Sequence, residues 1–350
     1  MSRLIALKKC GQSYWLDILT RDKIESGELK ERIEKEGLAG ITSNPAIFHQ
    51  AIANSDSYDQ QIKSMAESTP EEIYESLVIN DIQKACDVLR SIYTETAGVD
   101  GFVSLEVSPH LARDTEGTMN EARRLFALVD RPNCLIKIPG TKEGIPAIEQ
   151  MLFEGININV TLLFSVSVYE EVAHAYLRAM ERRKKEGKAL AGVRSVASFF
   201  LSRIDMLLDK QIEEKGKIAI ASAKMAYQSF FEIFSGDRWE ALATAGAKVQ
   251  RPLWASTSTK NPQYRDVMYV EPLIGRETVN TMPDKTAEAF DSHGEVIEDA
   301  ILLDIYEAEE LLDKHKSLLK QATDQLVQEG IQKFIDPFDE LLAYIRKKVL

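Results

Sequence analysis

The chain is poor in cysteine, with three among its 350 residues: Cys10, Cys86 and Cys134. Their odd number and wide spacing argue against a disulfide framework and against the paired CxxC arrangement of many zinc sites. Cys134 lies in an apolar run, where a free cysteine packs as a small hydrophobic residue. The fold must therefore be held together by a hydrophobic core.

The sequence also lacks long apolar runs and an excess of basic charge. No run approaches 18 apolar residues, so no membrane span is predicted. The opening MSRLIALKKC has lysines in its apolar run, unlike a secretory signal, and a cytoplasmic location is expected. A formal net charge of −12 argues against a general nucleic-acid binder. A few local cations could still bind a small anion.

Several familiar catalytic motifs are missing as well. The histidines show no HxxxH or HxH spacing, and no metal site is expected; they are His49, His110, His174, His293 and His315. There is no GxSxG elbow, no GxGxxG after a strand and no GxxxxGK[ST] loop. Any chemistry must come from other side chains.

What the sequence does contain is a repeated alternation of short apolar runs with helical patterns. Helices are expected from 68 to 93, where Ser68 or Thr69 can cap and Pro70 sits in the first turn, and at 115–129, 143–153 and 166–186. The expected strands are 13–19, 37–44, 101–107, 133–139, 156–164, 194–201, 248–257 and 268–274. Eight strands alternating with helices predict an α/β fold, a (β/α)8 TIM barrel, with a doubly wound open sheet as the alternative.

Two segments exceed a minimal barrel. The stretch 203–247 is long enough for two or three helices between the sixth and seventh strands. The stretch 295–350 is expected to form two more helices, about 296–329 and 335–349. No linker or internal repeat divides the chain, so residues 1–350 are predicted to be one domain.

Polar residues alternate with aliphatic ones along the expected strands. Ile156, Ile158 and Val160 would face the helices, which leaves Asn157, Asn159 and Thr161 facing the barrel interior. The same alternation turns Lys137 inward, between Ile136 and Ile138. It also turns inward Ser104, Glu106, Asp17, Thr42 and Asn44. Because barrel interiors are usually filled with branched apolar side chains, five polar strands predict a site near the C-terminal strand ends.

Each of these residues also has a structural explanation. Asn44 before Pro45 could cap a helix, Asp17 could belong to a turn, and Glu106 could be half of a structural ion pair. If they form a site, burial disfavours the charged form of the Lys137 amine, which then attacks carbonyls and forms a Schiff base. The Lys137–Glu106 distance, which the sequence does not supply, decides how strongly the carboxylate opposes this effect.

At this point the chain resembles the transaldolase family. The resemblance rests on GITSNPAIF, IKIPGTKEGIPAIEQMLFEGININVTLLFS, SVASFFLSRID, WASTSTKNP and EPLIGRETVNTMP, and covers most of residues 10–290. It implies a Schiff-base barrel enzyme of the pentose phosphate pathway, similar to the longer bacterial branch, with sugar phosphates as partners. It implies no metal or organic cofactor, and either a monomer or a homodimer.

The resemblance also implies roles for individual residues. Lys137 would be the nucleophile, Glu106 the acid/base acting through a water that Thr161 helps to hold, and Asp17 the base for the C4 hydroxyl. Substrate-binding positions would be Thr42, Asn44, Asn159, Ser198, Phe200, Arg203, Ser256 and Lys260.

One position departs from the family pattern. Shorter relatives carry a second arginine after the seventh strand, whereas this chain has WASTSTKNP, so Lys260 is the expected replacement as a phosphate ligand. Lys260 is also the rival nucleophile, although its loop setting is normally wet. Arg203 could instead be a surface residue paired with Asp205.

Two other functions remain open. One is a related Schiff-base aldolase that releases free dihydroxyacetone; such relatives vary at the position of Glu106, and the retained glutamate favours the transferase. The other is a catalytically silent barrel that serves as a binding or scaffold protein.

Overall fold

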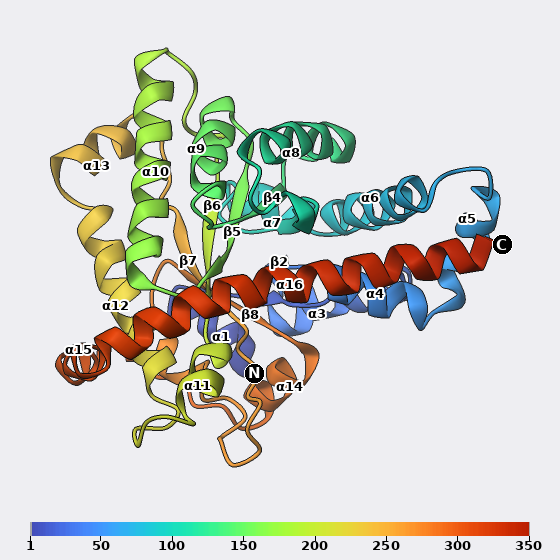
Figure 1. Ribbon diagram of the computed structural model, residues 1–350. Helices are drawn as coiled ribbons and strands as arrows, with labels where there is room; N and C mark the ends of the chain where they lie inside the picture. Colours follow the sequence, from blue (N-terminus) through green and yellow to red (C-terminus); the bar gives the residue numbers. More distant parts are fainter. Residues whose placement is uncertain (1, 350) are drawn as a thin grey trace.

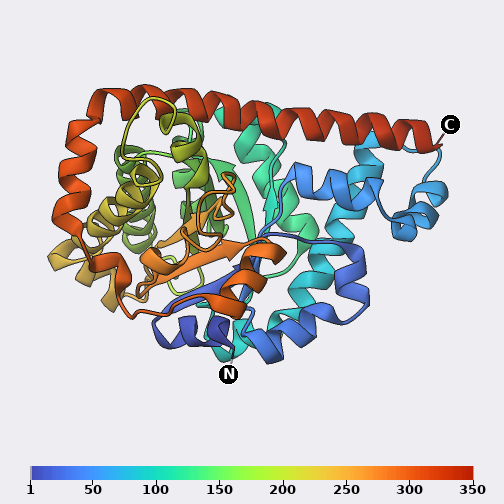
Figure 2. The same ribbon diagram turned by 90° about the horizontal axis from the view of Figure 1, so that it is seen from below.

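The computed structural model describes residues 2–349, in which eight parallel strands close into a barrel in chain order (Figures 1 and 2). The barrel closes where β1 pairs with β8, with Gln12 opposite Thr278. The strands are β1 (Gln12–Leu16), β2 (Gly40–Ile41), β3 (Phe102–Glu106), β4 (Cys134–Pro139), β5 (Ile158–Leu163), β6 (Ser195–Phe200), β7 (Arg251–Ala255) and β8 (Thr278–Met282). The predicted (β/α)8 barrel is confirmed, and the open sheet is excluded.

Helices surround this barrel, and several begin where the sequence predicts. Thr69 caps α6 in a capping box with Glu72, and Pro70 occupies the first turn. The α-helices are α1 (Arg3–Lys9), α2 (Arg21–Glu25), α3 (Glu28–Glu36), α4 (Pro45–Ala53), α5 (Asp59–Ser64), α6 (Pro70–Val88), α7 (Arg90–Glu95), α8 (Thr115–Val129), α9 (Gly144–Glu154), α10 (Val166–Lys185), α11 (Ser202–Leu208), α12 (Ile218–Ile233), α13 (Gly236–Thr244), α14 (Asp284–His293), α15 (Ile305–Lys314) and α16 (Lys316–Val349). The short 3₁₀ turns are η1 (Asp56–Tyr58), η2 (Pro109–Leu111), η3 (Glu271–Leu273) and η4 (Ala300–Leu302). The insertion between β6 and β7 holds α11, α12 and α13, as expected.

The eighth strand was predicted at the wrong place. The apolar stretch 268–274 forms no strand and contains the turn η3, because Pro272 cannot donate a ladder hydrogen bond in a central strand. Its apolar residues, including Leu273 and Ile274, are buried outside the barrel ladder. The true strand, β8, is rich in Thr and Asn, so a search for apolar runs overlooked it.

The predicted break near residue 330 is also wrong. A single helix, α16, runs from Lys316 to Val349 and includes Gly330 and Pro337. A Cβ on Gly330 would lie 3.0 Å from Cδ2 of Leu162, so this glycine lets the helix approach β5 closely. Figure 2 shows α16 as a rod along one edge of the whole molecule, and Figure 1 shows it crossing in front of the strands.

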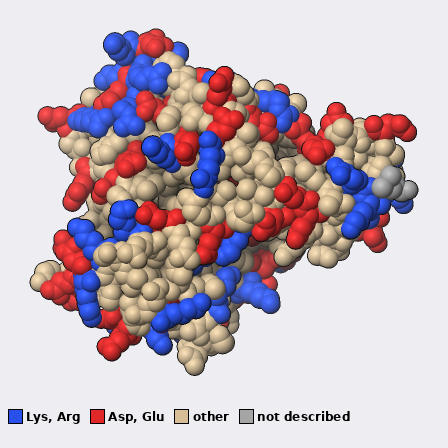
Figure 3. Space-filling view, in the orientation of Figure 1, with Lys and Arg blue, Asp and Glu red and all other residues tan. Residues whose placement is uncertain are grey.

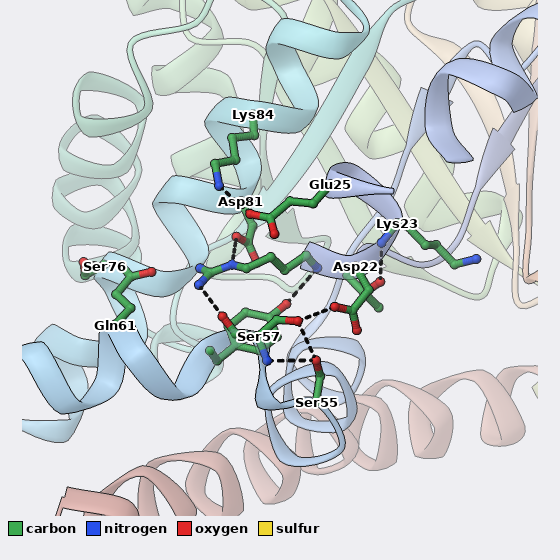
Figure 4. Close-up of polar contacts among 12 residues, drawn as sticks. Asp22, Lys23, Glu25, Ser55, Ser57, Gln61, Ser76, Asp81 and Lys84 are labelled. Carbon is green, nitrogen blue, oxygen red and sulfur yellow. Dashed lines mark hydrogen bonds and ion pairs between the residues drawn. The ribbon is translucent and has the colours of Figure 1, made fainter. Parts of the chain in front are cut away.

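A buried ion pair joins two of the outer helices. Arg21 Nε donates to Asp81 Oδ1 at 2.9 Å, linking the start of α2 to α6, and the guanidinium lies over the ring of Tyr58. Figure 4 shows Asp81 and Ser57 in this cluster, where the Ser57 carbonyl accepts a second bond from Arg21. These contacts of Arg21 therefore join the start of α2 to both η1 and α6.

The surface around this core is mixed in charge. On the face that carries α16, acidic and basic side chains are interspersed and no single sign dominates (Figure 3). Within residues 2–349, no helix combines the length and apolar character that crossing a bilayer requires.

Candidate active site

The inward alternation brings an amine and a carboxylate together at the ends of two neighbouring strands. β3 pairs with β4 so that Glu106 is the register partner of Lys137. Lys137 Nζ lies 3.5 Å from Glu106 Oε2 and donates a hydrogen bond of 2.9 Å to the Ser43 carbonyl. Lys137 is only 4% exposed. The Lys137–Glu106 distance, which the sequence left open, is thus short enough for a buried ion pair.

The environment of Glu106 sets its proton affinity. Burial raises the pKa of Glu106 to about 7, and the neighbouring Lys137 ammonium opposes part of that rise. Its Oε2 atom accepts no hydrogen bond from the described residues. A carboxyl group of this kind can accept and release a proton near neutral pH.

Asp17 lies immediately after β1, on the opposite side of the same opening. Thr42 Oγ1 donates to its carboxylate at 2.7 Å, and Thr42 Oγ1 also lies 2.7 Å from Thr281 Oγ1. Burial raises the pKa of Asp17, while the Thr42 hydrogen bond and the charges of Lys137, Lys260 and Arg203 oppose the rise. Asp17 is therefore a second acid/base candidate facing the amine.

These groups line one cavity of about 190 Å³ at the C-terminal ends of the strands. Its lining consists of Asp17, Thr42, Asn44, Lys137, Thr161, Ser198, Phe200, Arg203, Ala255, Ser256, Ser258, Lys260, Thr281, Pro283 and Phe334. Two residues expected in the site, Glu106 and Asn159, do not belong to this lining. The other predicted site residues thus converge on a single pocket.

Asn159 and Glu106 flank that cavity. Asn159 is fully buried; its Nδ2 donates to Ser104 Oγ at 3.0 Å and its Oδ1 accepts from Ser198 Oγ at 2.7 Å. It therefore positions Ser198, which lines the cavity. Glu106 lines an adjoining cavity of about 450 Å³ and reaches the main one through Lys137.

Asn44 and Thr161 differ in their hydrogen bonding. Asn44 Oδ1 accepts from the Ile47 N–H at 3.0 Å, so this residue caps α4 as well as lining the cavity. The Thr161 hydroxyl is buried and bonds to no described residue. A free hydroxyl beside the amine can hold a small polar group of a substrate.

The outer end of the cavity carries two cations. Arg203 Nη1 is buried and has no partner in residues 2–349, and burial lowers the pKa of its guanidinium. Lys260 Nζ donates to Ser258 Oγ at 2.6 Å, and burial together with Arg203 lowers its pKa. Among the described residues neither cation forms an ion pair, and two such cations side by side suit a phosphate.

Two alternatives from the sequence can be compared with this geometry. Arg203 is not paired with Asp205, whose carboxylate accepts instead from the Ala219 N–H and the Tyr269 hydroxyl, each at 2.9 Å. Lys260 is exposed at the rim, whereas Lys137 is enclosed among strands. The structure thus favours Lys137 over Lys260 as a desolvated nucleophile.

Sequence reasoning missed several residues of the cavity. Phe334 reaches in from α16, and its ring centroid lies 5.8 Å from Lys137 Nζ. Thr281 and Pro283 were missed because β8 was placed too early. No local signal marked Phe334, whereas the Thr-Val-Asn-Thr alternation of β8 could have revealed Thr281.

The described residues can be compared with the side-chain clusters that hold metal ions. Among residues 2–349, no group of three or more His, Cys, Asp or Glu side chains is placed to hold a metal ion. The groups in the cavity are an amine, the Asp17 carboxylate, hydroxyls and cations, with the Glu106 carboxylate 3.5 Å from the amine. Together they can bind a phosphorylated carbonyl compound and exchange protons with it.

The closed (β/α)8 barrel, with an amine and two carboxylates at the C-terminal strand ends, has the architecture of a barrel enzyme. The family model described as Transaldolase/Fructose-6-phosphate aldolase matches residues 14–345. The chain belongs to this family.

Curated relatives agree over the full length of the chain. It is 48% identical to "Transaldolase 2" of Nostoc sp., covering 100% of this chain and 98% of the relative. It is 47% identical to "Transaldolase" of Trichodesmium erythraeum and 44% identical to "Transaldolase" of Thermobifida fusca, covering 99% of this chain and 98% of each relative. The long C-terminal region is therefore shared with these proteins.

Proposed function

We propose that this protein is a transaldolase, a transferase of the pentose phosphate pathway. It transfers a dihydroxyacetone unit from sedoheptulose 7-phosphate to glyceraldehyde 3-phosphate, giving erythrose 4-phosphate and fructose 6-phosphate. The observation that carries the proposal is the buried Lys137–Glu106 pair, 3.5 Å apart, whose amine lines a pocket with a cationic outer end. Full-length identity to proteins named transaldolase supports it.

In the first half-reaction the neutral amine of Lys137 attacks the C2 carbonyl of the ketose. The resulting carbinolamine loses its hydroxyl as water, with Glu106 supplying a proton through a water molecule next to Thr161. This leaves a protonated Schiff base, which is an electron sink. The raised pKa of Glu106, about 7, suits a group that must donate a proton here and take one back later.

Carbon–carbon cleavage then depends on Asp17. Its carboxylate removes the proton of the C4 hydroxyl, the C3–C4 bond breaks, and the electron pair moves into the Schiff base to form an enamine. The aldehyde product leaves, and an acceptor aldehyde takes its place. Reversal of the same steps forms the new bond, and hydrolysis of the Schiff base restores the amine.

The remaining residues hold the substrate. Asn44, Asn159 and Ser198 bind the hydroxyls of the three-carbon unit, and Phe200 forms a wall. Thr42 orients Asp17 through its 2.7 Å hydrogen bond. The phosphate is bound by Arg203, Ser256 and Lys260.

Borohydride trapping tests the nucleophile directly. Reduction in the presence of fructose 6-phosphate should add a dihydroxyacetone-derived group to the peptide that holds Lys137, as shown by mass mapping. The Lys137→Met variant should take up no label, and Lys260→Met should still take it up. Label on Lys260 in the wild-type protein would refute the assignment.

The need for an acceptor aldehyde distinguishes a transaldolase from the alternative, an aldolase. With fructose 6-phosphate as donor, a transaldolase should turn over rapidly only when erythrose 4-phosphate is present. Equal turnover with and without acceptor would identify an aldolase that releases free dihydroxyacetone. Absence of both turnover and trapping would favour the silent scaffold.

We further infer a cytoplasmic protein that acts on sugar phosphates, as a monomer or homodimer, with the whole chain forming one domain. The metabolic role of the relatives supports the location. Sedimentation of the purified chain measures the oligomeric state, and fractionation of the source cells tests the location.

A further inference from the structure

A separate cavity of about 290 Å³ lies at the opposite pole of the barrel, which we call the N-terminal-pole cavity. It is lined by the first residues of β6 and β7 and by residues at or just before the start of β3. The candidate active site is built at the other ends of these strands. The cavity therefore cannot belong to the catalytic pocket, and nothing in the proposed reaction uses it.

The walls of the N-terminal-pole cavity are largely apolar. Phe102, Leu135 and Val196 line it from the strands, and Trp239 lines it from α13. Trp239 is half-buried, whereas the other two tryptophans of the chain are fully buried. Such walls accept the compact apolar body of a small molecule.

One wall carries a cation without a counter-charge. The five N–H groups of Arg194 make four hydrogen bonds, all to backbone carbonyls: Nε to Gly98 at 2.6 Å, Nη1 to Ala191 and Val193, and Nη2 to Ala97 at 3.0 Å. Within residues 2–349 it forms no ion pair, and burial lowers its pKa. A half-buried guanidinium of this kind gains from an anion brought next to it.

The other charges nearby do not neutralise Arg194. Arg251 is matched by Asp100 at 3.1 Å. Lys248 adds a further cation, and Glu277, the carboxylate of the lining, makes no ion pair with Arg194 in the described chain. The cavity is thus locally positive in a protein of formal net charge −12.

We propose that the N-terminal-pole cavity binds a small organic monoanion with an apolar body, such as an aromatic carboxylate. Its carboxylate accepts a hydrogen bond from the remaining Nη2 N–H of Arg194, and its ring packs between Trp239 and Phe102. This site is independent of the transaldolase reaction. It is a second ligand site on the same barrel.

Calorimetric titration with salicylate and its neutral analogue salicylamide tests the charge requirement without altering the protein. Salicylate should bind at least about tenfold more tightly to the wild-type chain, as expected when a charge-assisted hydrogen bond replaces a neutral one. In Arg194→Gln that preference should disappear. Equal affinity of the two probes for the wild-type protein would overturn the proposal.

A matched pair of variants tests the location. Ala243→Phe fills the cavity and should abolish salicylate binding, whereas Ala245→Phe, at an exposed alanine outside the lining, should leave it unchanged. Binding that persists in Ala243→Phe overturns the proposal. Binding that is lost in Arg203→Gln would place salicylate in the catalytic pocket and overturn it equally.

Discussion

At the scale of single residues, burial changes the proton affinity of the Glu106 carboxyl, which lies beside Lys137. The carboxyl is enclosed as deeply as the amine, and its raised pKa allows it to be neutral during part of the cycle. Glu106 can therefore take up and release a proton near neutral pH beside Lys137.

The pH dependence of activity should follow this carboxyl. Below about pH 7 Glu106 is protonated and cannot act as a base, so kcat should rise as the pH increases through about 7. In Glu106→Gln this inflection should disappear and kcat should fall by about 10² to 10⁴, the range typical of a lost general acid–base. A pH–rate profile from 5 to 9 measures both; an unchanged inflection in the variant would assign it to another group.

The same shift predicts an effect on stability. The pKa of Glu106 is higher in the folded protein (about 7) than in an unfolded chain (about 4.3), so the folded state holds more protons between these values. The free energy of unfolding should therefore fall as the pH rises from about 4 to about 7. The free energy of unfolding of Glu106→Gln should lack this fall, so relative to wild type it should rise by on the order of 3 kcal/mol across this interval.

Urea titrations at pH 4, 6 and 8 measure this gain. The Lys137 ion pair forms only when Glu106 is ionised, and its effect is already contained in the pKa of about 7, so the change of the unfolding free energy with pH is the informative quantity. Glu116→Gln, on an exposed glutamate of α8, serves as the surface control. The prediction would be contradicted if the difference in unfolding free energy between wild type and Glu106→Gln stayed constant with pH.

At the scale of elements, α16 closes the catalytic cavity. Phe334 from this helix is 5% exposed and packs beside Lys137. An enamine survives only where water is kept from protonating it. The helix therefore helps decide between transfer to an acceptor and loss of the three-carbon unit to solvent.

Replacing Phe334 tests this role. Phe334→Ala should admit water and raise the release of free dihydroxyacetone several-fold relative to transfer, measured with and without erythrose 4-phosphate. Phe338→Ala is the matched control, since Phe338 lies one turn further on and lines the adjoining cavity against Tyr74. An equal rise in dihydroxyacetone release in both variants would show that the effect comes from general loosening of α16.

The link between α2 and α6 should be a major contribution to stability. Asp81→Asn leaves the Arg21 guanidinium buried without its counter-ion, which should lower the free energy of unfolding by about 3 to 5 kcal/mol. The double variant Arg21→Met/Asp81→Leu, which removes both charges, should lose less. Chemical denaturation compares the two; an equal or larger loss in the double variant would contradict the prediction.

At the scale of the whole molecule, α16 packs against α4, α6 and α11 and thereby joins distant parts of the chain. A helix that bridges both halves of a barrel couples their unfolding. Thermal unfolding should therefore show one transition, with the same midpoint by far-UV circular dichroism and by tryptophan fluorescence. Two separated midpoints would indicate independent domains.

Features of the fold and site that depend on neighbouring residues in the chain could be predicted from the sequence. Period-two alternation around Lys137 and Asn159 predicted their inward direction, and the cap at Thr69 with Pro70 predicted the start of α6. Prediction failed where tertiary contacts override local signals. Two helices were predicted, about 296–329 and 335–349, yet α16 runs unbroken from Lys316 to Val349 and packs at Gly330 against Leu162.

The sequence by itself determined which side chains point inward, because strand alternation is a property of the backbone. It therefore predicted the barrel and the identity of most polar groups in its opening. The tertiary structure alone decided the distances, such as the 3.5 Å between Lys137 and Glu106, and brought Phe334 over the site from some 200 residues away in the chain. Burial depends on everything that packs around a residue, so the raised pKa of Glu106 could only emerge once the chain had folded.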